Sequence, residues 1–222
     1  MKVLRDLAAS FSYFSILPIA HSDAPPNDEA VAYLPVVGAL IGAISGAVAY
    51  GIFLLTHGQL AAAITAWILS IALSGAIHVD GFLDCCDGLL AMATPQRRLE
   101  IMRDPHHGTY AIAGMVMISV LWLYALVHVP AALLPAVLTI TGLVSRALAL
   151  SLWPANRVPK IVYAVIGLIV AFGVVALFGS FARRRLGGVL SGDCYGAAIV
   201  LAEIALLMIS AVSTSLGPGL LR

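Results

Sequence analysis

Charged residues are scarce in this sequence. Only 10% of the 222 residues are Asp, Glu, Lys or Arg, whereas 61% are hydrophobic, and the mean hydropathy is +1.02. A soluble domain carries about 25% charged and about 45–50% apolar residues, so its interior would not hold this much apolar surface. The composition excludes an ordinary soluble protein and predicts an all-α integral membrane protein. We expect residues 1–222 to form one membrane domain.

Several other signals are also missing. The net charge of +1 indicates no nucleic-acid partner. The cysteines, Cys85, Cys86 and Cys194, include no CxxC pair, so no disulfide framework is expected. Leu7–Ala20 has the apolar length of a signal peptide but no small-residue cleavage site, and it predicts a short interfacial helix that ends at Pro18. Because long polar segments are absent, any chemistry is expected at the membrane surface or just inside it. None of these features predicts an oligomeric state.

Apolar runs of about 20 residues, the length that crosses a bilayer, occupy most of the chain. They are Val31–Leu55, Leu60–Ile77, Ala111–Val127, Ala131–Leu152, Ile161–Gly179 and Gly196–Ser213. In the first run, Gly38, Gly42 and Gly46 recur every four residues on one helical face, which favours close packing against another helix. The sequence therefore predicts a polytopic helix bundle of about six spans.

Lysine and arginine indicate which polar segments face the cytoplasm. The cations that agree on one side are Lys2, Arg5, Arg97, Arg98, Arg103, Arg157 and Lys160. With six spans, Arg183–Arg185 fall on the opposite side, against the positive-inside rule. This conflict predicts either a broken or re-entrant span or a local exception to the rule. The other cations predict a multi-pass inner-membrane protein with its chemistry on the cytoplasmic side.

Most of the acidic residues near a span end lie in "HVDGFLDCCDGLL", which follows an uncharged run. If Gly75–Leu90 is helical, Asp80, Asp84 and Asp87 lie at i, i+4 and i+7, within about 60° of one another, and Cys85 points away. Carboxylates at a membrane edge need a compensating charge. Oxygen ligands favour Mg²⁺, or Mn²⁺, and magnesium is usually completed by substrate phosphate. The pattern therefore predicts a phosphate- or diphosphate-bearing substrate, with a solvated loop or a cation pathway as alternatives.

A basic segment, "QRRLEIMRDPHHGTY", comes next. The guanidinium groups of Arg97, Arg98 and Arg103 suit phosphate oxygens, although they could also serve topology alone. Asp104 precedes Pro105, so a helix is expected to stop there.

The end of this segment starts the next span. Gly108 and Thr109 provide free backbone N–H groups at a helix start, which favours an anion. The adjacent His106 and His107 point in different directions, so one of them could carry a proton or both could lie at the surface.

Other charged residues stand alone in apolar surroundings. Asp193, among glycines, is expected either to cap the last helix or to reach the same site. Arg146 lies within an apolar run and is expected to face the bundle interior, paired with a phosphate or with an acid such as Glu203.

Together these segments resemble a known family. "HVDGFLDCCDGLLA", "RRLEIMRDPHHGTYA" and "RRLGGVLSGDCYGAAIVLAE" are similar to the cobalamin-5′-phosphate synthase family, the adenosylcobinamide-GDP ribazoletransferases, and "FSYFSILPIA" is similar to that family's opening. The resemblance implies a multi-span, Mg²⁺-dependent membrane enzyme. Such an enzyme joins GDP-activated cobinamide to α-ribazole or its 5′-phosphate and releases GMP.

The resemblance also implies roles for the residues. Asp80, Asp84 and Asp87 would hold Mg²⁺, and Asp84 and Asp87 would thereby serve catalysis. Asp104 would be a further ligand or the base that receives the hydroxyl proton. The groups that would bind substrate are Arg97, Arg98, Arg103, Gly108, Thr109, Arg146 and Asp193.

Two other enzyme classes and one non-enzyme class share parts of this pattern. CDP-alcohol phosphotransferases place aspartates along a membrane helix, but their "DG" is followed by Ala-Arg, and no arginine stands beside Asp84. Membrane aromatic prenyltransferases carry two acidic motifs on separate helices, whereas this chain has one dense motif. A cation-coupled transporter would place its charges at mid-span rather than at a span end.

Overall fold

The computed structural model describes residues 2–19, 26–152 and 166–215. Within these ranges the regular structure is helical and contains no strand, so the predicted all-α class is confirmed. The α-helices are α1 (Lys2–Phe14), α2 (Asp28–Val31), α3 (Leu34–Thr56), α4 (Gln59–Leu73), α5 (Ile77–Leu90), α6 (Pro95–Ile101), α7 (Thr109–His128), α8 (Leu134–Ala149), α9 (Ile166–Arg185) and α10 (Gly192–Ser215). Two 3₁₀ turns, η1 (Ala131–Leu133) and η2 (Leu150–Leu152), flank α8.

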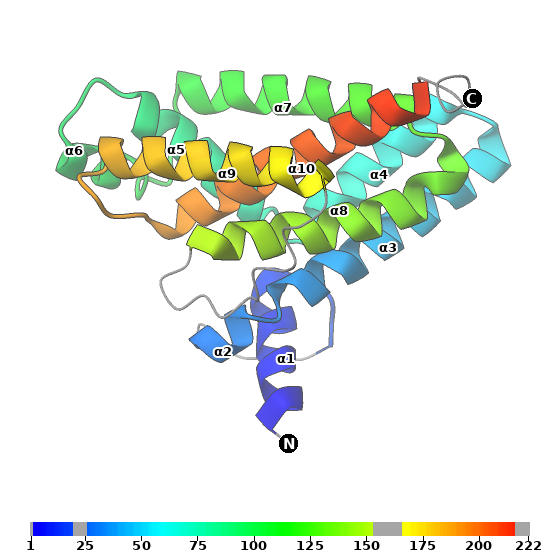
Figure 1. Cartoon of the computed structure of the whole chain (residues 1–222), viewed down its shortest axis with the longest axis horizontal. Helices are drawn as coiled ribbons and strands as arrows, with labels where there is room; N and C mark the ends of the chain where they lie inside the picture. Colours follow the sequence, from blue (N-terminus) through cyan, green and yellow to red (C-terminus); the bar gives the residue numbers. More distant parts are fainter. Residues whose placement is uncertain (1, 20–25, 153–165, 216–222) are drawn as a thin grey trace.

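The long helices form a multi-pass membrane bundle (Figure 1). Four segments among the described residues are long and apolar enough to cross a bilayer, or up to five if α4 and α5 count as one broken span. The four are Asp28–Thr56, Thr109–His128, Ala131–Ala149 and Gly192–Ala211. The expected span Ile161–Gly179 begins outside the described residues and continues as α9.

The expected span Leu60–Ile77 is wrong in its extent, because the helix breaks before its end. α4 stops at Leu73, and both Gly75 (φ 62°) and Ala76 (φ 59°) adopt the left-handed conformation that ends helices. α5 then leaves at 87° to α4. The 15 residues of α4 rise about 22 Å, less than the roughly 30 Å of a hydrocarbon core. The structure therefore contains the broken span that the basic residues predicted as one alternative.

The arginines at the end of α9 lie on the same side as those of α6. Arg185 donates from Nε to the carbonyl oxygen of Leu89 (2.8 Å) and from Nη2 to that of Ala91 (3.2 Å). Arg98 donates from Nη1 to the carbonyl oxygen of Arg185 (2.9 Å). These guanidinium groups satisfy the free carbonyls at the carboxyl end of α5. Of the two alternatives that the sequence left open for Arg183–Arg185, these contacts favour the broken span over an exception to the positive-inside rule.

The predicted glycine face of α3 is confirmed, and its partner is α8. A Cβ atom on Gly38 would collide with the α8 backbone, one on Gly42 with the carbonyl of Leu138, and one on Gly46 with the carbonyl of Leu134. The backbones of α3 and α8 therefore touch along this face, which is how membrane helices associate without a hydrophobic driving force.

We expect Gly42→Val to destabilise the protein by about 1–3 kcal/mol, because the new side chain must push α8 away from α3. Thermal unfolding of the detergent-purified protein measures the effect. Gly51→Val is the matched control on the same helix, since a Cβ there meets no atom within 4 Å. Equal melting temperatures for the two variants would contradict the packing assignment.

The N-terminal helix projects from the bundle (Figure 1). It begins earlier and ends earlier than the expected Leu7–Ala20, since α1 spans Lys2–Phe14 and stops short of Pro18. The residue before a proline is disfavoured in a helix, so the chain turns before that point. The apolar side of α1 packs on α3, where Phe11 contacts the buried pair Val37 and Ile41.

Candidate active site

The aspartate segment folds as predicted. α5 covers the acidic stretch and places Asp80, Asp84 and Asp87 at helical spacing. This face of α5 points toward the loop between α6 and α7, where all three carboxylates have partners. Cys85 points away from this face and lies with its Sγ 3.8 Å from that of Cys194.

Glycines allow α10 to approach α5 at this point. A Cβ on Gly81 would lie 2.9 Å from the Cα of Asp193, and a Cβ on Gly196 would lie 3.0 Å from the carbonyl oxygen of His78. The close contact brings Asp193, in the first turn of α10, near enough to interact electrostatically with Asp80 and Asp84. Of the two roles that the sequence left open for Asp193, the geometry favours the one at the shared site.

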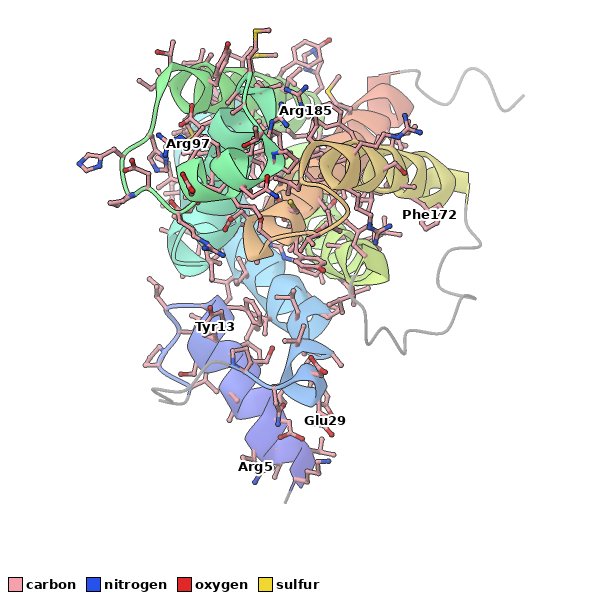
Figure 2. All side chains as sticks on the ribbon, turned by 90° about the vertical axis from the view of Figure 1, so that its left-hand side faces the viewer. Arg5, Tyr13, Glu29, Arg97, Phe172 and Arg185 are labelled. Carbon is pink, nitrogen blue, oxygen red and sulfur yellow. The ribbon has the colours of Figure 1, made fainter. Side chains whose placement is uncertain are left out.

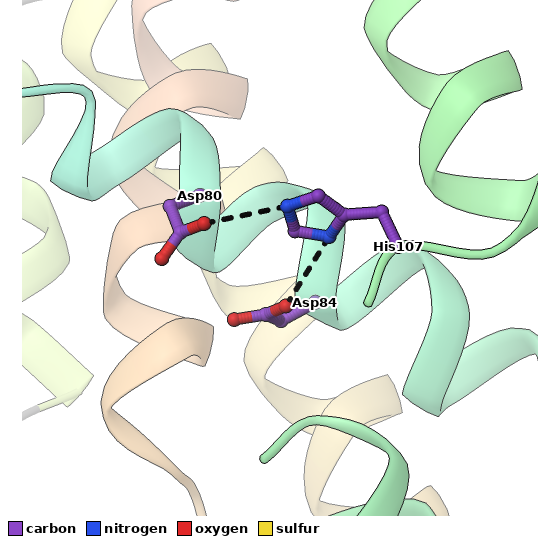
Figure 3. A group of neighbouring side chains, drawn as sticks. All are labelled: Asp80, Asp84 and His107. Carbon is purple, nitrogen blue, oxygen red and sulfur yellow. Dashed lines mark ion pairs between the residues drawn. The ribbon is translucent and has the colours of Figure 1, made fainter. Parts of the chain in front are cut away.

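An imidazole lies between the first two aspartates (Figure 3). His107 Nε2 is 3.5 Å from Asp80 Oδ1, and His107 Nδ1 is 3.7 Å from Asp84 Oδ1. One donor atom from each residue lies within 4.8 Å of the other two, the arrangement of a small cation site. The Asp84 side chain is 14% exposed, whereas that of Asp80 is 61% exposed. Asp84 is therefore the inner member of the group, and Asp80 forms its outer rim.

Asp87 makes different contacts from Asp80 and Asp84 on α5. Its Oδ2 accepts the backbone N–H of Gly108 (2.5 Å) and its Oδ1 accepts that of Ala111 (3.0 Å). The carboxylate thus satisfies free N–H groups at the start of α7, where the helix dipole favours a negative charge. The N–H of Gly108, expected to bind substrate phosphate, has its partner within the protein. Asp87 holds the loop that carries His107 against α5.

Asp104 organises the loop before His107. Its Oδ1 accepts the backbone N–H of His106 (3.0 Å) and lies 2.8 Å from the ring Nδ1 of the same residue. Chiefly because of the backbone N–H, and also because of the ring, the pKa of Asp104 is lowered from its usual value. Asp104 is not among the donor atoms that converge with His107 in the part of the chain described.

The arginines of the basic segment divide into three environments. Arg98 is buried, and its Nε and Nη2 both donate to the carbonyl oxygen of Ala91 at the end of α5. Arg97 is exposed and pairs with Glu100 (2.8 Å). Arg103 is exposed and interacts electrostatically with Asp193, which places its charge beside the carboxylates. Of the three, Arg103 is the one near the site.

Two further residues were predicted to bind substrate, Thr109 and Arg146. Thr109 begins α7 and is exposed. Arg146 is buried in α8 and forms an ion pair with Glu203 of α10. The sequence allowed an acid or a phosphate as its partner, and the structure supplies the acid.

The central position of His107 was not predictable from spacing. The sequence offered either a proton carrier or a surface residue at this histidine. α6 and the loop after it reverse the chain, and only this reversal returns His107 to the face of α5 that carries Asp80 and Asp84. The nearest sequence signal is the Asp-Pro step at Asp104, which ends one element shortly before the histidine.

Comparison with known proteins identifies the family. A family profile described as cobalamin-5-phosphate synthase matches residues 6–160 and 148–211, which include the whole acidic and basic region. The chain belongs to this family. The resemblance that the motifs predicted is thereby confirmed, and the chain is an enzyme of this family. No solved structure matches it.

Curated members of the family cover most of the chain. A protein of Deinococcus radiodurans is 30% identical over 230 residues, which span 91% of this chain and 84% of the relative. One of Vibrio parahaemolyticus is 33% identical over 235 residues, 87% of this chain and 86% of the relative. One of Azorhizobium caulinodans is 38% identical over 121 residues, 52% of this chain and 46% of the relative. All three are named adenosylcobinamide-GDP ribazoletransferase.

Proposed function

We propose that this protein joins GDP-activated (adenosyl)cobinamide to α-ribazole, or to its 5′-phosphate, and releases GMP, in the final assembly of cobalamin. The observation that carries the proposal is the convergence of Asp80, Asp84 and His107 in a chain whose curated relatives bear that enzyme name. A diphosphate-activated substrate needs a cation beside it, and this group of donors is suited to hold one.

The donor set fits a divalent cation. Carboxylate oxygens suit Mg²⁺ and Mn²⁺, and the imidazole adds a ligand that Mn²⁺ also accepts. Asp80, Asp84 and His107 would therefore hold Mg²⁺, or Mn²⁺, and Asp87 would steady the loop that brings His107 to them. When bound there, the cation would supply positive charge to offset that of the diphosphate and of GMP.

The protein's own groups position the reaction. A ribose hydroxyl that is free in both α-ribazole and its 5′-phosphate attacks the phosphorus on the cobinamide side, a new P–O bond forms, and the P–O bond to GMP breaks. Arg103 supplies a guanidinium beside Asp193 that can hold a phosphate oxygen. The hydroxyl proton passes to Asp193, a carboxylate beside Asp80 and Asp84 that lies outside the donor group assigned to the cation. Asp104, whose pKa is lowered by its hydrogen bonds to His106, is the weaker proton acceptor.

We assign the site to the cytoplasmic side of the inner membrane. The support is the distribution of cations, since Arg98 and Arg185 meet at the end of α5 and Arg97 belongs to the same short helix as Arg98. The positive-inside rule places such a cluster in the cytoplasm. Arg157 and Lys160, which the sequence places on the same side, lie outside the described residues.

The deciding experiment incubates the purified protein with Mg²⁺, α-ribazole and GDP-cobinamide. We expect cobalamin and GMP in equal amounts, complete loss of turnover in excess EDTA, and recovery on adding back Mg²⁺ or Mn²⁺. Full activity in EDTA would contradict the cation assignment. Turnover of a CDP-activated lipid with an alcohol, but not of this pair, would favour a CDP-alcohol phosphotransferase.

A further inference from the structure

A cavity of about 300 Å³ opens beside the aspartate group, where α1, α3, α8 and α10 meet the start of α5. Asp80 and Asp193 line it, and Leu34, Leu150 and Ile199 contribute to its apolar wall. Small-molecule sites span about 300–1,000 Å³, so this cavity lies at the lower end of that range. It has room for one small organic molecule and not for a macrocycle.

Aromatic rings also line the cavity. Phe14 of α1 stacks on His78 of α5, with ring centroids 6.3 Å apart and planes at 25°, and Tyr13 meets Phe14 edge-on at 5.0 Å. Tyr195 of α10 adds a further ring. Figure 2 shows Tyr13 at the end of α1 that faces the bundle, opposite to Arg5. Walls of this kind favour a flat aromatic ligand through offset and edge-on stacking.

We propose that this cavity binds the heteroaromatic base of the acceptor nucleoside and directs its sugar hydroxyl toward Asp80 and Asp193. The inference rests on the proposed function and extends it to the site of one substrate. Of the two substrates, the corrinoid is the macrocycle, whereas the nucleoside combines a flat apolar base with a hydroxyl-bearing sugar. Asp80 belongs both to the cavity wall and to the donor group around His107, so a molecule seated here meets the diphosphate. The cavity then limits the size of the base that the enzyme accepts.

Gly192 offers a test that leaves the fold intact. It lines the cavity, and a Cβ built on it meets no atom within 4 Å. The Cβ of a leucine there lies in open space, and we expect the rest of the side chain to take room from a ligand. Gly51→Leu is the matched control, because a Cβ on Gly51 also meets no atom within 4 Å and Gly51 lies outside the cavity.

Equilibrium dialysis of α-ribazole against the purified full chain, with Mg²⁺ and without GDP-cobinamide, measures the affinity. We expect Gly192→Leu to raise the Kd at least about tenfold and Gly51→Leu to leave it unchanged. Equal affinity in the two variants overturns the proposal, as does the absence of α-ribazole binding, the result expected of a lipid-filled cavity. A rise confined to the Kd of GDP-cobinamide also overturns it.

The turnover assay keeps this inference separate from the proposed function. A wild-type protein that binds α-ribazole with the expected sensitivity to Gly192→Leu, yet makes no cobalamin, supports the cavity assignment and contradicts the chemistry. A protein that makes cobalamin while Gly192→Leu binds α-ribazole normally supports the chemistry and overturns the cavity assignment.

Discussion

Asp84→Asn is expected to abolish measurable turnover, a loss of at least about a hundredfold, while the protein still inserts in the membrane and melts at its usual temperature. The substitution keeps the size of the side chain and removes its charge. Asp84 is the least exposed of the donors around His107, so an amide there weakens the cation site most. Activity with the two substrates and thermal unfolding, both in detergent, measure the result.

We also expect Asp87→Asn to abolish turnover, because Asp87 holds the loop that carries His107 against α5. Its carboxylate accepts two backbone N–H groups at the start of α7, so an asparagine, with one oxygen, satisfies them only in part. We therefore expect Asp87→Asn to lower the melting temperature as well, by weakening a helix cap worth about 1 kcal/mol. Retained activity in Asp84→Asn would defeat the assignment of the cation to this group of residues.

Glu203→Leu is expected to destabilise the protein by about 3–5 kcal/mol, the largest loss of stability that we predict. The substitution leaves the guanidinium of Arg146 buried without its counter-charge, since the Arg146 side chain is only 5% exposed. An unpaired charge inside a bundle costs far more than the pair contributes. The free energy of unfolding in mixed micelles is the measurement.

The double variant Arg146→Met, Glu203→Leu separates the charge from the packing. We expect it to recover most of the lost stability, because apolar residues of similar size replace a buried ion pair at little cost. Its KM for GDP-cobinamide should equal that of the wild type if Arg146 serves the bundle alone. An increase in that KM with normal stability would restore Arg146 to the substrate site.

The helices of the bundle were largely predictable because apolar length and glycine spacing are local properties. The run of small residues in α3 predicts a close neighbour, and the contact of Gly42 with α8 confirms it. The break after Leu73 was not visible, since an uncharged run continues through the two left-handed residues Gly75 and Ala76. The side of Arg183–Arg185 stayed open in the sequence for the same reason, because counting spans requires every run to cross.

In the candidate site, too, only the features that depend on local spacing were predictable. Helical periodicity placed Asp80 and Asp84 on one face of α5, as the structure shows. Periodicity does not show which residues that face contacts, so the contacts of Asp87 and His107 were not predictable. Asp87 was expected to share a cation with its neighbours, and in the structure its carboxylate caps α7.

By itself the sequence determined that this chain is a membrane protein and that Asp80, Asp84 and Asp87 share one helical face. It also determined that the motifs are those of the cobalamin-5-phosphate synthase family. These follow from composition and from short-range spacing, which the backbone geometry of a helix converts directly into position. Only the tertiary structure shows that the imidazole of His107 joins the donor group. It also shows that arginines from α6 and α9 donate to the carbonyl groups at the end of α5, and that α1 lines a cavity beside the carboxylates. Such contacts join residues far apart in the chain, and they exist only once the helices have packed.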